Sequence, residues 1–295
     1  MMLARRAFPP LAGLLAAALA AASPAPAQTS RPPQPLPQAA PQLPRTVQPL
    51  SVSAFFVEKG EQIRSGVKWH VFRARNDENG DLPIVGESDD AAPTFSLEPG
   101  IYVVHAAYGL AAATRRVEIG NTPAIERLVL NCGALKVEAT IGDKPVPAAK
   151  LTSRISAMLP TGERRLIAED VPADDLVRLP EGRYFVESNY GDSNASVSAE
   201  ISIKAGQLTD ATFHHNAATL TLKLVNQPGG EALADTAWSV LTPGGDVIRE
   251  SIGAFPSMIL AEGNYTVVAR HDGRVYTREF DVKSGLDQDV EVMAK

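Results

Sequence analysis

Apolar and polar side chains alternate along short stretches of this chain, which is typical of strands with one buried face. Leu220, Leu222 and Leu224 are separated by the polar Thr221 and Lys223. The same order recurs from residue 135 to 139. After residue 30, no stretch keeps a helical period for more than two turns. The pattern therefore predicts an all-β protein.

Turn-forming residues lie between these stretches. His271-Asp272-Gly273 contains Asp-Gly, a strong hairpin signal, and Gly109 and Gly191-Asp192 lie at matching places earlier in the chain. About seven short strands fall in each segment of about 80 residues, which is typical of a small two-sheet sandwich.

One motif occurs three times. It consists of a leucine, then a Pro-Gly or Glu-Gly pair, and then a tyrosine near the start of a strand. It occupies residues 97–104, 179–186 and 260–267, and its tyrosines are Tyr102, Tyr184 and Tyr265. These tyrosines lie 82 and 81 residues apart, and a fixed period of this size indicates one small domain in three copies. We expect the glycines of the motif, Gly100, Gly182 and Gly263, to supply a permissive backbone in a turn.

The tryptophans follow the same period, because Trp69 and Trp238 lie 169 residues apart, close to two repeats. The middle copy has Arg154 or Ile155 at the expected place and is therefore the divergent one. We predict three tandem β-sandwich domains, at residues 49–132, 133–216 and 217–295. The junctions are too short for flexible linkers, so neighbouring domains should touch.

The N-terminus has the composition of a signal peptide, residues 1–27. Arg5 and Arg6 precede an apolar run at residues 11–22, and Ala25-Pro26-Ala27 provides a small-residue cleavage site. The run is shorter than the roughly 20 residues that span a bilayer, and no later stretch is apolar enough to do so. We therefore expect a periplasmic or secreted protein without an integral membrane segment after cleavage. The arginine pair leaves ordinary and twin-arginine export open.

Residues 28–48 are rich in Pro, Gln and Ala, and we expect them to form a disordered, extended tether. The whole chain has a formal net charge of −6. The predicted mature chain carries −8, because the signal segment contains two arginines and no acidic residue. An acidic chain without clustered Lys and Arg disfavours a nucleic-acid partner.

Cys132 is the only cysteine, so no intrachain disulfide is possible. Its thiol is either buried and inert or paired with another chain, and the sequence leaves both states open.

No set of residues assembles into a reaction centre, so we predict no catalytic, cofactor-binding or metal-binding residue and no enzymatic activity. His214 and His215 are adjacent. Because neighbours on a strand point to opposite faces, we do not expect these two histidines to bind one metal ion together. Residues 77–81 resemble the start of a calcium loop, but Leu82 and Ser88 replace its glycine and its final glutamate. A tight turn at Asn79-Gly80 is the simpler interpretation. The other histidines are His70, His105 and His271.

The leucine, Glu-Gly or Pro-Gly and Tyr-x-Val motif resembles the transthyretin-like repeat superfamily, with its carboxypeptidase regulatory-like and collagen-adhesin B-type relatives. The resemblance covers residues 50–295 and implies prealbumin- or immunoglobulin-like sandwiches, but no activity. Adhesin repeats of this kind often carry a Lys–Asn isopeptide bond promoted by an acid four residues after the motif tyrosine. Ala106, Ser188 and Ala269 occupy that position here, and Glu187 lies one residue early, so we expect no such bond.

Tandem duplication and a proline-rich tether favour a non-enzymatic periplasmic scaffold or protein-interaction protein, whose partner would be another envelope protein. The alternative is a module that binds a cell-envelope glycan through exposed aromatic residues. Tyr108, Tyr190 and Tyr276 are the candidates for that surface, and half-buried packing is the competing interpretation. A hydrolase is the third hypothesis.

Overall fold

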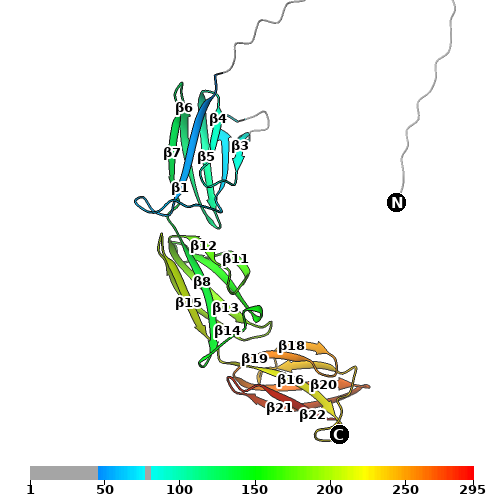
Figure 1. The fold of residues 1–295 in the computed structure, drawn as a ribbon. Helices are drawn as coiled ribbons and strands as arrows, with labels where there is room; N and C mark the ends of the chain where they lie inside the picture. The colour runs from blue at the N-terminus through cyan, green and yellow to red at the C-terminus, as the bar shows by residue number, and fades with distance from the viewer. Residues whose placement is uncertain (1–45, 77–80) are drawn as a thin grey trace, which may run out of the picture. The chain divides into compact units, whose positions relative to one another are not determined.

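The structure is a computed structural model that describes residues 46–76 and 81–295. Apart from a 3-10 turn at Ala148–Lys150, the regular elements in these ranges are all β-strands, so the predicted fold class is confirmed (Figure 1). The signal peptide predicted at residues 1–27, the predicted tether up to residue 45 and the turn at residues 77–80 lie outside the described residues.

Seven strands between residues 48 and 129 form two antiparallel-rich sheets around one core, which we call sandwich 1. The sheet orders are β4-β1-β7 and β3-β2-β5-β6. The bounds are β1 Gln48–Phe55, β2 Lys68–Arg73, β3 Ile84–Ser88, β4 Thr94–Leu97, β5 Gly100–Tyr108, β6 Ala111–Ile119 and β7 Ala124–Val129.

Sandwich 2 repeats this arrangement with the sheets β12-β8-β15 and β11-β10-β13-β14, and the short β9 pairs antiparallel with the end of β8. Its strands are β8 Cys132–Ile141, β9 Lys144–Pro145, β10 Leu151–Met158, β11 Arg164–Pro172, β12 Val177–Pro180, β13 Gly182–Tyr190, β14 Ser196–Ile203 and β15 Leu208–His214.

Sandwich 3 has the sheets β19-β16-β22 and β18-β17-β20-β21. Its strands are β16 Ala217–Val225, β17 Ala237–Leu241, β18 Val247–Ile252, β19 Ser257–Ala261, β20 Gly263–His271, β21 Arg274–Val282 and β22 Gln288–Met293.

The buried apolar side chains of the described residues form three separate clusters, which we call core 1, core 2 and core 3 after the sandwich that supplies most of each. The predicted alternation holds in β16, where Leu220, Leu222 and Leu224 are fully buried in core 3. Each cluster takes residues from both sheets of its sandwich, so burial of these apolar faces holds the two sheets together.

The first and last strands of each sandwich pair in parallel: β1 with β7, β8 with β15, and β16 with β22. Every other pairing between the named strands is antiparallel. Alternation in the sequence gives the buried face of a strand and not its neighbour, so this parallel pairing was not predicted.

The motif tyrosines form the same hydrogen bond in all three copies. The hydroxyls of Tyr102, Tyr184 and Tyr265 each donate to the backbone carbonyl four residues earlier, at 2.8, 2.8 and 2.9 Å. Each ring is buried in its core while its polar tip is satisfied by the preceding turn, the arrangement known as a tyrosine corner.

The role predicted for the motif glycines is wrong for two of the three copies. Gly263 has a positive φ of 155°, but Gly100 and Gly182 do not have positive φ values. All three begin a strand, and a Cβ placed there would meet the tyrosine ring at 3.7–3.8 Å, an ordinary contact. The small residue therefore lies beside the ring instead of forming a left-handed turn.

The two tryptophans are equivalent, and their middle counterpart is Ser153, so the prediction of Arg154 or Ile155 is wrong. Trp69 lies opposite Ala106 and Trp238 opposite Ala269, while Ser153 lies opposite Ser188 at the same step of the ladder. The loops between these strands differ in length between copies, so counting along the sequence placed the residue incorrectly.

Candidate functional site

The three tyrosines that are candidates for an exposed contact surface are all packed against other side chains. Tyr190 is buried, and its ring meets that of His215 edge-on at 6.1 Å. Tyr108 is partly buried and meets the ring of Phe56 at 5.9 Å. Tyr276 is partly buried against core 3. Half-buried packing therefore describes these residues better than an aromatic platform.

The histidine pair of sandwich 2 separates as strand alternation predicts. His214 is exposed and its Nδ1 lies 2.8 Å from the Thr140 hydroxyl. His215 is buried, its Nε2 lies 3.0 Å from the Ser188 hydroxyl, and burial lowers the pKa of its imidazole.

The Ser188–His215 pair has two of the three groups of a hydrolase triad, but it lies inside the core. Both side chains are buried. Within the described residues, the Nδ1 atom of His215 has no hydrogen-bond partner, so no carboxylate orients the imidazole. The pair is thus enclosed and incomplete as a nucleophile and base.

Core 2 differs from its neighbours because this pair replaces apolar residues. His215 donates its backbone N–H to Thr140 at 2.8 Å, as Leu130 and Ala294 donate to Phe55 and Val225 in the other sandwiches. His215 therefore takes an apolar position, while Ser153 takes that of a tryptophan. The middle copy therefore has a small polar cluster where the other two copies have an indole, and this is the physical difference between them.

His70 and His105 form a second pair, on neighbouring strands of sandwich 1. Their rings lie 6.2 Å apart, and His70 Nε2 lies 3.5 Å from a carboxylate oxygen of Glu87. Burial lowers the pKa of His105, and the charge of His70 adds to this effect. Among the described residues, no group of three or more His, Cys, Asp or Glu side chains is placed to hold a metal ion.

The hairpin between β5 and β6 contacts β12 of the next sandwich. Leu110 donates its backbone N–H to the carbonyl of Arg178 at 3.0 Å. Gly109 has a φ of 62°, and a Cβ there would lie 2.8 Å from the Cβ of Arg178. Gly109 thus meets two requirements at once: a left-handed backbone and close approach to the next sandwich.

The same contact recurs between sandwiches 2 and 3. Gly191, with a φ of 75°, lies in the β13–β14 hairpin, and a Cβ there would be 3.0 Å from Ile259 of β19. The Asn194 amide donates to the Tyr265 hydroxyl at 2.8 Å, and its oxygen accepts the Ala261 N–H at 3.1 Å. Asn194 therefore ties sandwich 2 to the tyrosine corner of sandwich 3.

Only two residues separate the last strand of one sandwich from the first strand of the next, and the second of them is an asparagine each time. The carbonyl of Asn131 accepts the N–H of Glu181, and that of Asn216 accepts the N–H of Glu262, both at 2.8 Å. These glutamates are the Glu of the Glu-Gly motif. The first copy has Pro99, which has no N–H to donate, at this place.

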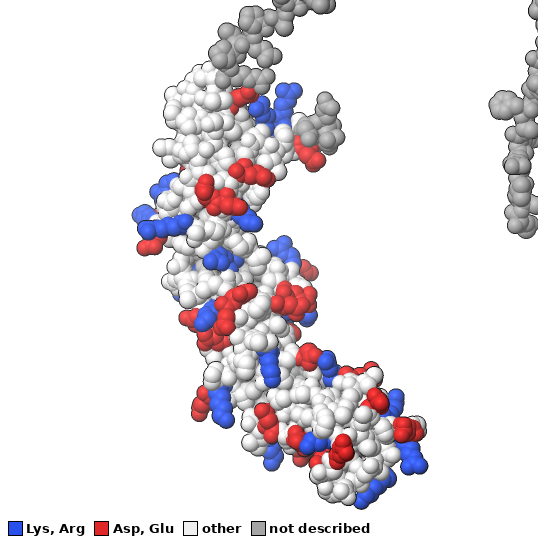
Figure 2. Space-filling model, turned by 45° about the vertical axis from the view of Figure 1, so that its right-hand side comes forward, with Lys and Arg blue, Asp and Glu red and all other residues white. Residues whose placement is uncertain are grey.

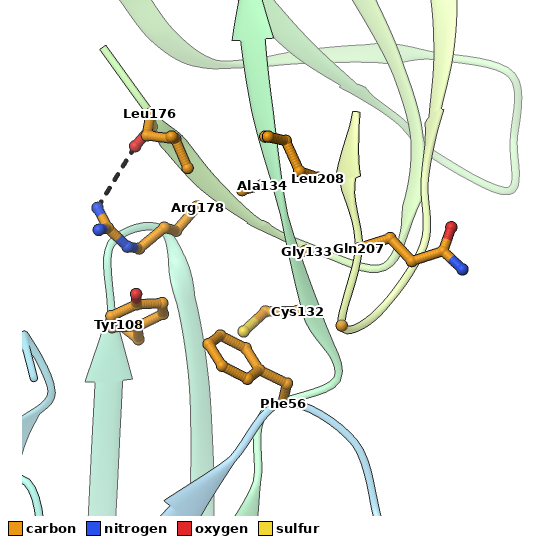
Figure 3. A pocket seen from close by; sticks show the side chains of 10 residues that line it. Phe56, Tyr108, Cys132, Gly133, Ala134, Leu176, Arg178, Gln207 and Leu208 are labelled. Atoms are coloured by element: carbon orange, nitrogen blue, oxygen red, sulfur yellow. Dashed lines mark hydrogen bonds between the residues drawn. The ribbon is translucent and has the colours of Figure 1, made fainter. Parts of the chain in front are cut away.

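A small pocket of about 190 Å³ lies at the first junction (Figure 3). The Arg178 guanidinium lies 4.6 Å from the centre of the Tyr108 ring, and its Nη1 donates to the Leu176 carbonyl at 3.4 Å. Phe56 and Cys132 also line the pocket, and Phe56 lies beside the Tyr108 ring. The pocket is smaller than the roughly 300 Å³ at which small-molecule sites begin.

Cys132 begins β8 of sandwich 2, but its side chain belongs to core 1. It is a free, fully buried thiol. Burial raises its pKa, and nearby Arg178 opposes this only in part. These features favour the inert thiol over the intermolecular disulfide.

Two large apolar side chains of sandwich 3 are exposed at and just after the end of β18. Ile252 is 79% exposed and Phe255 is 59% exposed. Ile252 borders a hollow of about 510 Å³ whose lining includes Ser239, Glu250 and Arg270. Such residues are the places where a partner would bury apolar area.

Charged side chains of both signs are interspersed over the face shown in Figure 2, without a continuous basic stripe. In the described part of the chain, no helix is long and apolar enough to cross a membrane.

A family profile described as the Rhizobiales growth-associated tandem repeat domain matches residues 219–294, which lie in sandwich 3. No curated protein matches the chain. Among solved structures, the TIE protein of Bacillus anthracis is 17% identical with a TM-score of 0.24, and the alignment covers 85% of this chain and 51% of that chain. This chain thus spans about half the length of that protein.

Two pilins are also similar. GBS52, the minor pilin of Streptococcus agalactiae, is 13% identical with a TM-score of 0.30, over 57% of this chain and 95% of that chain. The streptococcal ancillary pilin is 12% identical with a TM-score of 0.30, over 84% of this chain and 99% of that chain. None of these similarities assigns an activity to this chain.

Proposed function

We propose that this protein is a non-enzymatic scaffold or interaction protein of the bacterial periplasm, where it binds another envelope protein. In this proposal, residues 1–27 direct export and residues 28–48 form a tether. Three transthyretin-like domains follow at residues 49–132, 133–216 and 217–295. The proposal applies equally to a secreted protein.

The observation that carries the proposal is the junction contact that occurs twice. Gly109 and Gly191 bring a hairpin against the next sandwich, and Asn131 and Asn216 tie each connector to the following Glu-Gly motif. These contacts keep adjacent sandwiches together without a flexible linker, which suits a protein that presents binding surfaces in a fixed sequence. Three separate hydrophobic cores support the count of three domains.

The proposal that the protein is not an enzyme is supported by the state of the Ser188–His215 pair. A nucleophile must reach its substrate, and both of these side chains are buried. A glycan-binding role has less support, because Tyr108, Tyr190 and Tyr276 pack against other side chains.

The test is recovery of partners from cross-linked periplasm with three forms of the chain. We expect the wild-type protein to capture a specific envelope protein and the double variant Ile252→Ser, Phe255→Ser to lose it. Ile125→Ser is the matched control, because Ile125 is 80% exposed but lies in sandwich 1. Recovery of no specific protein, together with binding on a glycan array, would replace this proposal with the glycan-binding alternative.

A further inference from the structure

In each sandwich, the first and last strands are the ones that connect to the rest of the chain, and these two strands pair in parallel. β1 and β7 pair over six positions, β8 and β15 over seven, and β16 and β22 over six. A further backbone hydrogen bond follows each ladder, from Leu130 to Phe55, His215 to Thr140 and Ala294 to Val225, at 2.8–2.9 Å.

Parallel pairing places the two chain ends of a sandwich at opposite ends of the ladder. The chain enters at the start of the first strand and leaves at the end of the last strand. Tension along the chain therefore slides these two strands past each other, and the evenly spaced bonds of the parallel ladder share the force. In an antiparallel hairpin pulled from its two ends, the bonds would instead break one at a time.

The first strand is also held on its other side. β1, β8 and β16 are the central strands of their sheets, and each pairs antiparallel with β4, β12 or β19. Their inward side chains are fully or almost fully buried, as in β16, where Leu220, Leu222 and Leu224 have no exposed area. Extraction of this strand therefore breaks two ladders and exposes part of the core.

The hairpins of the four-stranded sheets lie between the first and last strands in the sequence. They feel tension only after the parallel ladder has failed. Between sandwiches, the chain passes from β7 to β8 and from β15 to β16 through two residues, and the Asn131 and Asn216 carbonyls are bonded to the following sandwich. No slack segment separates one ladder from the next between residues 81 and 295.

From these observations we infer that the protein bears tension: it is a connector in which each sandwich resists extension by its own two chain ends. This inference rests on the proposed scaffold function, since tension arises only when the tether and a bound partner pull in opposite directions. The resisting element is the parallel ladder, and the three ladders act in series.

Single-molecule force spectroscopy tests the inference by changing the direction of pulling on the same fold. In the first geometry, handles are attached at the two ends of the chain from residue 28 to 295. In the second, one handle stays at the C-terminus and the other is attached through Gln227→Cys, at an exposed position just after β16. Cys132 is buried and stays unlabelled in the folded chain.

The second geometry separates β16 and β22 from their common end, starting at the pair Val225 and Met293. We expect every end-to-end unfolding event to require at least about twofold more force than this peeling of sandwich 3. In the end-to-end geometry all the bonds of a ladder share the load, whereas in peeling one bond at a time carries it. Equal or lower force in the end-to-end geometry would overturn the inference. Recovery of partners does not enter this measurement, so failure of the scaffold proposal and failure of this inference are distinguishable.

Discussion

At the scale of single residues, the motif tyrosines show how a short sequence signal acts. Each hydroxyl binds the carbonyl four residues earlier, so the turn and the strand that follows it are fastened together. The Tyr265 hydroxyl has a second partner, the Asn194 amide of the preceding sandwich. One tyrosine therefore stabilises both its own core and a junction.

Replacement of these tyrosines by phenylalanine separates the two roles. We expect Tyr102→Phe to lower the free energy of unfolding by about 1 kcal/mol, the usual contribution of one hydrogen bond. Tyr265→Phe should cost more, because it also leaves the Asn194 amide without that acceptor. Denaturant unfolding of both variants measures the difference, and equal losses would mean that the Asn194 contact contributes nothing.

His215 predicts a pH dependence. Burial lowers the pKa of its imidazole in the folded state, so between that pKa and the unfolded value of about 6.5 the unfolded chain binds more protons. Stability should therefore fall as the pH drops below about 6.5 and return as the pH rises.

The variant His215→Leu, which introduces the residue found at this position in sandwich 1, should reduce that pH slope. The variant deprives the Ser188 hydroxyl of its partner, so the slope between pH 5 and 7, and not the stability at one pH, is the quantity to compare. His214→Gln is the control, because His214 is exposed. An unchanged slope in His215→Leu would show that the buried imidazole does not titrate on unfolding.

At the scale of elements, the hairpin that follows the motif tyrosine makes different contacts in different copies. Gly109, Gly191 and Gly273 all have positive φ values, between 62° and 75°. A Cβ at Gly191 would meet Ile259, whereas nothing lies within 4 Å of one at Gly273. The last copy therefore keeps the backbone requirement without the close approach seen at Gly191.

Alanine substitutions at these glycines measure the junction contact. Gly191→Ala and Gly273→Ala both place a side chain in the left-handed region, at a cost of about 1 kcal/mol. Gly191→Ala should destabilise further because its Cβ lies 3.0 Å from the Ile259 side chain. Thermal or denaturant unfolding of the two variants gives the comparison, and equal destabilisation would contradict a tight junction.

The sequence predicted the strands and their buried faces, because alternation and turn residues are local signals. It did not predict the parallel pairing of β1 with β7, since nothing within one strand identifies its neighbour. It also misplaced the middle equivalent of Trp69, because Ser153 has no visible likeness to tryptophan and the intervening loops vary in length.

One junction signal is local and stands in the sequence, at the residue before the motif glycine. Glu181 and Glu262 replace Pro99 in the two later copies, and an N–H is needed only where a preceding connector offers a carbonyl. The contacts of Gly109 and Asn194 could not be predicted in this way. They depend on which loops of two different sandwiches meet, and that information is not local.

At the scale of the whole molecule, adjacent cores should unfold with partial coupling, because each junction contributes a few contacts rather than a large shared core. Asn194 provides two hydrogen bonds between sandwiches 2 and 3. Its replacement by alanine removes both and leaves the Ala261 N–H without this acceptor.

We therefore expect Asn194→Ala to make the unfolding of sandwiches 2 and 3 more independent. In limited proteolysis, the chain should be cut sooner near the connector at residues 215–216. Asn264→Ala is the control, since Asn264 is exposed on β20. If both variants are cut at the wild-type rate, the Asn194 contact does not hold the junction, and the contacts of Gly191 and Asn216 remain as the ones that do.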